Sequence, residues 1–299
     1  MTASPNQRAW KRLCKNRPAM VSALFLALIV VAACLVPVVS PHDAMHGSDA
    51  QFSPPGWQHW FGTDVHGRDL FTRVFAGTRV SLLVGAVGAA VSLVIGVCWG
   101  MVAGYVGGRI DGLMMRIVDV LYALPSIVFV IVLITTLEGL VKRWLGTVAP
   151  GFVPMARMLF LFVGLGAVSW LTMARIVRGQ VLALRSRPFV LASQSLGAGH
   201  VRILFRHILP NVVGIVIVYL TLTVPAIILY ESFLSYLGLG IQPPAASLGT
   251  LLAEGASQIN PIRVLWWLIA CPGLVLGLTL LALNFLGDGL RDAFDPRAD

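Results

Sequence analysis

The sequence predicts an all-α integral membrane protein with six transmembrane helices. Its 299 residues are 57% hydrophobic and only 12% charged, about half the charge of a soluble domain. The mean hydropathy is +0.84, and too few polar residues remain to cover the outside of a soluble core. Uncharged stretches also reach the roughly 17–25 residues that a bilayer-crossing helix needs. These observations exclude a water-soluble enzyme and a disordered chain.

Each predicted span is a run without Asp, Glu, Lys or Arg. In chain order the six runs are Pro18–Pro41, Val80–Gly108, Val120–Leu137, Met158–Ala174, Ile208–Tyr230 and Val264–Gly287. A seventh run, Ser232–Ala253, is interrupted by Gly238, Gly240, Pro243 and Pro244. Because lipid-exposed backbone must satisfy its own hydrogen bonds, we interpret this seventh run as a loop or re-entrant turn.

The first run has a competing interpretation as a signal peptide. Basic residues precede it, and Val31-Ala32-Ala33-Cys34 resembles a lipoprotein processing box. The apolar run nevertheless continues past Cys34 and reaches membrane-spanning length. We therefore expect a retained anchor.

The distribution of basic residues predicts the orientation. With the N-terminus in the cytoplasm, 15 of the 22 Lys and Arg residues fall on the cytoplasmic side. Both termini and the segment Arg175–Arg206 are then cytoplasmic, and Glu138–Arg157 is external. We expect an N-terminal part over 1–79, a core of five spans over 80–287, and a cytoplasmic tail over 288–299.

The net charge of +9 does not indicate nucleic-acid binding. The basic residues are scattered between apolar runs without interleaved aromatic residues, which favours contacts with membrane lipid. The four cysteines show no CxxC spacing, so we expect neither a disulfide framework nor a zinc site.

The patterns of common enzyme sites are absent. GxxxxGK[ST], HExxH and GxSxG do not occur, so we expect no catalytic residues, bound cofactor or metal in this chain. His42 and His46 lie four residues apart, but Pro41 and Gly47 flank them and disfavour a ligand-bearing helix. We interpret both histidines as solvated loop residues.

The polar stretch between the fourth and fifth runs predicts a helix–turn–helix hairpin at about residues 186–210. Pro188 suits the first turn of a helix, and Gly197 and Gly199 interrupt the chain before a second helix. Helical spacing predicts one apolar face in this second helix, comprising Val201, Leu204 and Ile208. It places two basic residues on another face, Arg202 and Arg206.

This hairpin resembles the EAA loop of ABC-importer permeases. The family pattern is Glu-Ala-Ala, three residues, Gly, nine residues, Ile, one residue and Leu-Pro. Its first Ala, its Gly and its Leu-Pro fall on Ala192, Gly197 and Leu209-Pro210. Three positions depart from the pattern, with other residues in place of Glu, the second Ala and Ile: Leu191, Ser193 and His207. The resemblance implies an ATPase-coupling hairpin that includes Leu191, Ala192, Ser193, Leu196, Gly197, Arg202, Arg206, Leu209 and Pro210.

Other stretches extend the resemblance. Phe61–Asp69, with Arg73 and Gly77, is similar to the segment after the first span in C-type subunits of dipeptide/oligopeptide permeases. Leu286–Arg297 is similar to their C-terminal signature, and the run 118–125, Val-Asp-Val-Leu-Tyr-Ala-Leu-Pro, also fits.

The resemblance implies a type I ABC-importer permease fold in the cell (inner) membrane of a bacterium or archaeon. It implies a homologous B-type permease subunit, two cytoplasmic ATPase subunits that bind ATP and Mg²⁺, and an extracytoplasmic solute-binding protein. This chain would then be non-catalytic. It would form half of the pathway for peptides or a similar small solute, and the sequence does not specify which solute.

A secondary transporter or channel subunit is the alternative function. Such proteins place polar or charged groups near mid-membrane, whereas the six runs keep charge out of their centres. Glu231, at the outer end of the fifth run, either lines the pathway or pairs with an outer arginine at the interface. Asp119 is three residues from Arg116, which predicts an ion pair between them.

Overall fold

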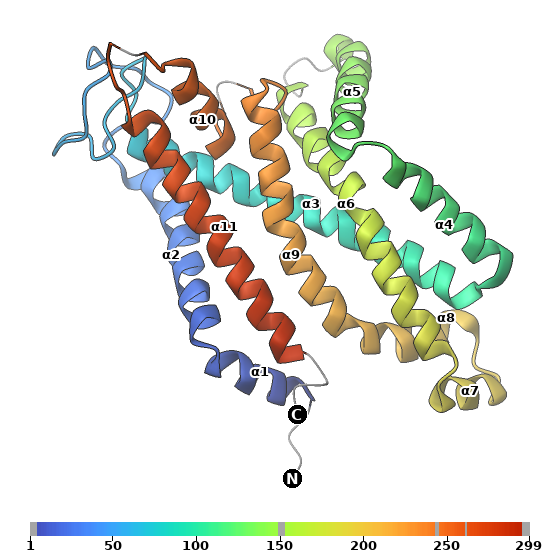
Figure 1. The fold of residues 1–299 in the computed structure, drawn as a ribbon. Helices are drawn as coiled ribbons and strands as arrows, with labels where there is room; N and C mark the ends of the chain where they lie inside the picture. The colour runs from blue at the N-terminus through green and yellow to red at the C-terminus, as the bar shows by residue number, and fades with distance from the viewer. Residues whose placement is uncertain (1–4, 149–152, 243–244, 261, 295–299) are drawn as a thin grey trace. The chain divides into compact units, whose positions relative to one another are not determined.

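The computed structural model describes residues 5–148, 153–242, 245–260 and 262–294. Within these ranges the regular elements are helices, apart from one isolated β-bridge. The all-α prediction is therefore confirmed. In chain order (Figure 1) the elements are α1 Pro5–Lys15, α2 Arg17–Val39, α3 Leu70–Val106, α4 Gly108–Ala123, α5 Ser126–Val148, α6 Val153–Arg185, α7 Pro188–Ser195, α8 His200–Ile203, a π-helical segment Leu204–Ile208, α9 Leu209–Tyr236, α10 Leu248–Ser257 and α11 Trp267–Phe294.

Among the described residues, five helical stretches are long and apolar enough to cross a bilayer: α2, α3, most of α6, the continuous stretch His200–Tyr236, and α11. The predicted third span differs, because α4 and α5 meet at a bend of 94°. The bend falls at Leu124 and Pro125. Proline lacks an N–H and disfavours helical geometry in the residue before it, so the helix ends there. The count becomes six when this bent pair is one span.

The seventh uncharged run forms a loop followed by a short helix. The loop after Tyr236 confirms the sequence interpretation, but α10 was not predicted. Its start carries a capping box: the Ser247 hydroxyl accepts from the Thr250 N–H at 3.1 Å, and the Thr250 hydroxyl accepts from the Ser247 N–H at 2.7 Å. This reciprocal pair satisfies backbone donors at the helix start.

The helices form two compact units, each assembled from distant parts of the chain. One contains residues 1–86 and 225–289, and the other contains 87–224 and 290–299. In the first unit α11 packs directly on α2 (Figure 1), where Gly289 approaches Ala19 so closely that an added Cβ would overlap its methyl group. The expected division into 1–79, 80–287 and 288–299 stays a prediction.

The second unit has an apolar core that includes the predicted hairpin. Its buried residues come from α3, α6, α7, α8, the π-helical segment and α9. They are Val97, Met101, Met173, Val177, Val181, Val190, Ile203, Ile208, Val212 and Val216. The hairpin is therefore part of a packed domain rather than a free surface loop.

Candidate functional site

The turn of the hairpin is a helix C-cap built around Gly197. The Ala198 N–H donates to the Ser193 carbonyl at 3.1 Å, and the Gly197 N–H donates to the Gln194 carbonyl at 2.9 Å. Gly197 has φ +80°, the left-handed conformation that glycine adopts without a Cβ penalty. These features form a Schellman motif at the end of α7. The predicted helix–turn–helix geometry is confirmed.

The second limb of the hairpin has a register that the sequence analysis did not anticipate. The π-helical segment Leu204–Ile208 follows directly on α8, and Ile203 and Ile208, five residues apart, are both buried. Val201 was expected on the same apolar face as Ile208 but is exposed. That expectation is wrong because a π-turn advances the chain by an i→i+5 bond instead of i→i+4.

The inner side of the hairpin is fixed by apolar packing. Val190 of α7, Ile203 and Ile208 have fully buried side chains and contact the core of the second unit. Burying a Val or Ile side chain contributes about 1.5–3 kcal/mol. Both limbs are therefore packed against α3, α6 and α9.

The outer side of the hairpin is apolar and basic. Five large apolar side chains of the hairpin are exposed, and Leu196 at the turn is 88% exposed. Arg202 and Arg206 are also exposed. The five apolar residues are Phe189, Leu191, Leu196, Val201 and Phe205. Such a mixture of apolar residues and arginine is typical of a protein-binding surface.

The remaining predicted hairpin residues lie around this surface. Ala192 and Pro210 are exposed, and Leu209 is half-buried. The Ser193 hydroxyl donates to the Phe189 carbonyl at 2.9 Å and lies 3.4 Å from His207 Nε2. The hairpin thus brings the predicted positions together on one short structural element.

A cavity of about 670 Å³ adjoins the hairpin where the family pattern has Glu. Leu191 occupies that position and lines the cavity with Gln194 and residues of α3. Tyr105 and His200 also line it, with the Tyr105 hydroxyl 2.9 Å from His200 Nδ1. Arg185 lines it as well, and none of the described residues in its wall is acidic.

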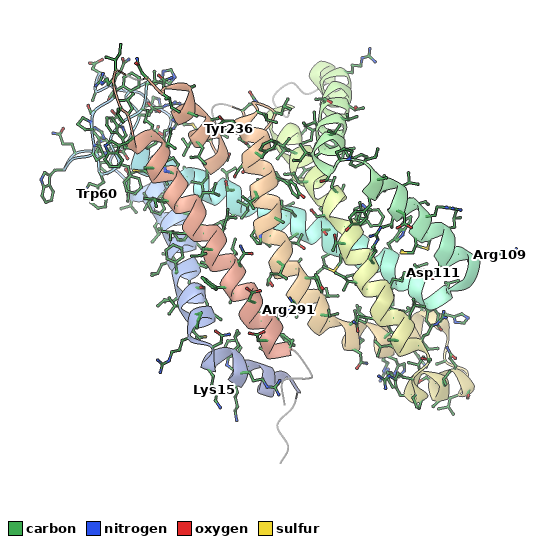
Figure 2. All side chains as sticks on the ribbon, viewed as in Figure 1. Lys15, Trp60, Arg109, Asp111, Tyr236 and Arg291 are labelled. Carbon is green, nitrogen blue, oxygen red and sulfur yellow. The ribbon has the colours of Figure 1, made fainter. Side chains whose placement is uncertain are left out.

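Charged residues of α4 pair with α6. Both carboxylate oxygens of Asp111 accept from Arg178, with 2.7 Å between Oδ2 and Nη2, and Figure 2 labels Asp111 on α4. Asp119 accepts from Arg175 at 2.6 Å. The expected pair of Asp119 with Arg116 is therefore wrong: the structure supplies a partner from α6.

The segment that leads into α3 contains a network of charges. Asp64 Oδ2 accepts from Arg68 Nε at 2.7 Å and from Arg73 Nη1 at 2.5 Å. Arg73 also donates to both carboxylate oxygens of Glu254 on α10, at 2.7 and 3.1 Å. Asp64 and Arg73 belong to one short sequence pattern, whereas Glu254 lies 181 residues from Arg73 and no local pattern connects it to them.

The pKa of Asp64 is lowered from its ordinary value of 3.8. Burial alone would raise the pKa. Hydrogen bonds from the backbone N–H groups of Arg68 and His66, the charge of Arg73 and a hydrogen bond from the Arg68 side chain outweigh it. The carboxylate is therefore the favoured form in the folded chain.

Glu231, which was expected to face the pathway or an outer arginine, is enclosed in the first unit. Its side chain is fully buried at 0% exposure. Ser235 donates to Oε1 at 2.6 Å and Ser81 donates to Oε2 at 3.3 Å. Among the residues described here, it has no basic partner. A pathway role for Glu231 stays a prediction.

The fold resembles a solved importer structure. A chain of the methionine ABC transporter MetNI, in an inward-facing conformation, matches with a TM-score of 0.53 and 20% identity. The match covers 75% of this chain and 97% of that chain. The protein thus has the fold of an ABC-importer permease, a multi-pass membrane protein.

Sequence comparison shows the family. The chain belongs to the binding-protein-dependent transport system inner membrane components, whose model matches residues 96–299. Residues 4–55 match the N-terminal TM domain of oligopeptide transport permease C. The chain is 46% identical to the dipeptide transport system permease protein DppC of Bacillus subtilis, over 98% of this chain and 86% of that protein. It is 44% identical to the oligopeptide transport system permease protein OppC of Escherichia coli K12, over 97% and 91%. It is a permease subunit of an ABC importer.

Proposed function

We propose that this chain is the C-type permease subunit of a peptide importer in a bacterial or archaeal inner membrane. Relatives named for dipeptide and oligopeptide transport cover nearly the whole chain, which supports short peptides as the solute. The chain forms half of the translocation pathway, and a homologous B-type permease forms the other half. An extracytoplasmic binding protein delivers the solute.

The hairpin couples this pathway to two cytoplasmic ATPase subunits. The observation that supports this proposal is its two-sided construction: Val190, Ile203 and Ile208 are fixed in the core, whereas Leu196 and Phe205 face outward. An ATPase subunit bound to the exposed side of the hairpin can therefore move the membrane-spanning helices that pack against its buried side. Leu191 gives this chain an apolar contact in place of the acid of the family pattern.

The energy source can be tested by copurification. We expect the isolated chain to bind and hydrolyse no ATP, because it has no phosphate-binding loop. ATPase subunits should copurify with the tagged chain from its native host, and Mg²⁺-dependent hydrolysis should appear only in that complex. Tight ATP binding by the homogeneous subunit, or peptide uptake that continues without any ATPase subunit, would contradict the proposal.

The proposed orientation can be tested with single cysteines in a cysteine-free background. We expect Thr147→Cys to react with a membrane-impermeant thiol reagent added to intact cells, or to spheroplasts where an outer membrane blocks access. Ser195→Cys should react only after the membrane is permeabilised, because the hairpin is proposed to be cytoplasmic. The reverse labelling pattern would show that the basic residues do not set the orientation as expected.

A further inference from the structure

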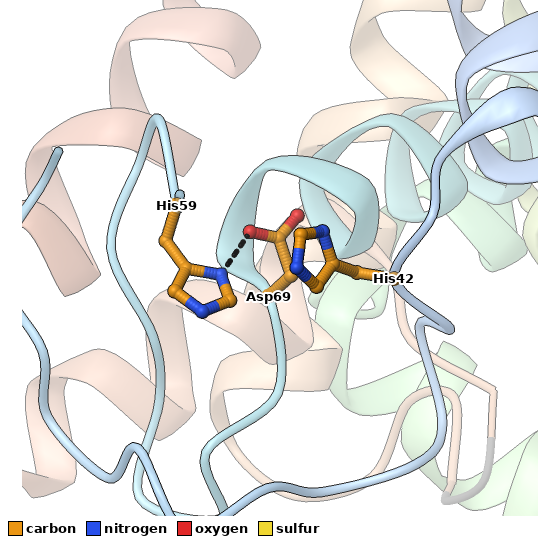
Figure 3. Close-up of side chains that lie close together, drawn as sticks. All are labelled: His42, His59 and Asp69. Carbon is orange, nitrogen blue, oxygen red and sulfur yellow. Dashed lines mark hydrogen bonds and ion pairs between the residues drawn. The ribbon is translucent and has the colours of Figure 1, made fainter. Parts of the chain in front are cut away.

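Three side chains meet between α2 and α3 (Figure 3). The proposed transport function assigns them no role. His42 lies just after α2, His59 lies within the connecting segment, and Asp69 immediately precedes α3. One potential ligand atom from each lies within 4.8 Å of the other two. His59 Nδ1 is 2.9 Å from Asp69 Oδ1, and the rings of His42 and His59 have centroids 4.6 Å apart.

Apart from the contact between His59 and Asp69, no described group occupies these donor atoms. Asp69 uses its other oxygen, Oδ2, to accept from the Thr72 N–H at 2.8 Å and the Thr72 hydroxyl at 2.7 Å, which fixes its orientation. The His42 ring is half-buried, and it has no hydrogen-bond partner in the described part of the chain. Partial burial of an imidazole without a hydrogen-bond partner costs free energy, and a bound ligand would offset this cost.

We propose that His42, His59 and Asp69 bind a divalent transition-metal ion, with Zn²⁺ as the preferred ion. Two imidazoles and one carboxylate form a common three-residue zinc ligand set, and water completes the coordination. Carboxylate-rich Ca²⁺ or Mg²⁺ sites have a different composition. The ion would replace the proton shared by His59 and Asp69, so its binding would release a proton.

The geometry requires only a small adjustment. Ligand bonds of about 2.0–2.2 Å in a tetrahedral site place donor atoms about 3.4 Å apart. His59 and Asp69 are already close enough, and since all separations lie within 4.8 Å, the widest must shorten by at most about 1.4 Å. Rotation of the His42 side chain can provide this movement without breaking a hydrogen bond.

A neighbouring cavity provides access for the ion and space for its water ligand. It has a volume of about 560 Å³ and is lined by His42, Asp69, Trp57, Trp60 and the end of α2. A bound ion would connect the end of α2 with the start of α3 through His59. It would therefore stabilise the segment that contains the Asp64–Arg73 motif. This differs from the interpretation of His42 as a solvated loop residue, whereas His46 is indeed exposed, at 86%.

The test uses the full chain in lipid nanodiscs, purified with a histidine-free affinity tag. ZnCl₂ is titrated in competition with a chromophoric chelator, and CoCl₂ binding is followed by its visible absorption. We expect one ion per chain and a thermal transition that rises with Zn²⁺ concentration, since the ion binds the folded state. Wild-type protein without stoichiometric Zn²⁺ binding would overturn the proposal.

Variants identify the ligands. Loss of a residue that only hydrogen-bonds a metal ligand lowers metal affinity about 10–100-fold. His42→Ala removes a ligand itself, so it should lower the Zn²⁺ affinity by at least that much. His42→Asp keeps a ligand and should retain more affinity than His42→Ala. The control is His46→Ala, four residues along the same segment, which should bind like wild type. Equal affinity in wild type and His42→Ala would overturn the assignment, and metal-free melting curves show whether each variant is folded.

Discussion

Replacing Gly197 with valine is expected to reduce peptide uptake at least five-fold while the chain still inserts in the membrane. An added Cβ at Gly197 meets no atom within 4 Å, so crowding is not the cause. The cause is φ +80°, where a β-branched residue is a strong outlier and strain costs about 1–3 kcal/mol. The strain would open the Schellman turn and misplace Leu196. Uptake into vesicles that contain the full transporter measures the effect.

A matched control lies two residues away. Gly199 also has free space around an added Cβ, but its φ is −66°, which valine adopts readily. Gly199→Val should therefore transport nearly as well as wild type. Gly197→Asn should retain more uptake than Gly197→Val, because asparagine tolerates the left-handed conformation. Equal uptake by the two valine variants would show that the turn conformation is not needed for coupling.

The basic residues of the hairpin provide a milder test of the same surface. Exposed ion pairs contribute only about 0.2–1 kcal/mol, so a single reversal at Arg202 or Arg206 should have little effect. The double reversal to Glu should release ATPase subunits from the complex, most strongly at low salt, where charges are least screened. If the arginines only contact lipid headgroups, the ATPase would stay bound.

Replacing Arg73 with leucine is expected to give the largest loss of stability. Arg73 is 4% exposed and pairs with both Asp64 and Glu254, so its removal leaves buried negative charge. Breaking a buried ion pair costs about 3–5 kcal/mol. Arg68 still contacts Asp64, which places the expected cost near about 3 kcal/mol. Thermal unfolding of the purified transporter should show a decrease on the order of 10 °C in the transition of this subunit.

Arg263→Leu is the control for lost positive charge. Arg263 is exposed and donates to the Phe52 carbonyl at 3.3 Å in the same unit, so its replacement should change stability by less than about 1 kcal/mol. The losses of stability in Arg73→Leu and Glu254→Gln should not add, because both variants remove the same contact between Arg73 and Glu254. Comparable losses for Arg73→Leu and Arg263→Leu would contradict the buried-network interpretation.

The same network gives an expected pH dependence. The pKa of Asp64 is lower in the folded chain than its ordinary value of 3.8. Its contribution to stability is therefore complete above pH 3.8 and is lost as the pH falls through the lowered folded-state pKa. Asp64→Asn should remove this part of the acid sensitivity, which can be followed by comparing the melting temperatures of wild type and variant between neutral and acidic pH.

The sequence by itself determined the features that depend on composition and on nearby residues. Long uncharged runs predicted the apolar helices, and Pro188 with Gly197 predicted the hairpin and its turn. A helix start or a left-handed turn is encoded within a few residues, because the hydrogen bonds that form it are local. The family resemblance depended on such local patterns too.

Only the tertiary structure decided which distant groups meet. It paired Arg73 with Glu254 and Asp119 with Arg175, placed Glu231 among serines, and brought His42 to His59. Helical spacing gives the face on which a side chain lies but not the helix that packs against this face. The π-turn also shifted that face in the hairpin, where burial of Ile203 and Ile208 overrode the regular α-helical register. Packing of the whole chain sets these contacts, so they could not be predicted from neighbouring residues.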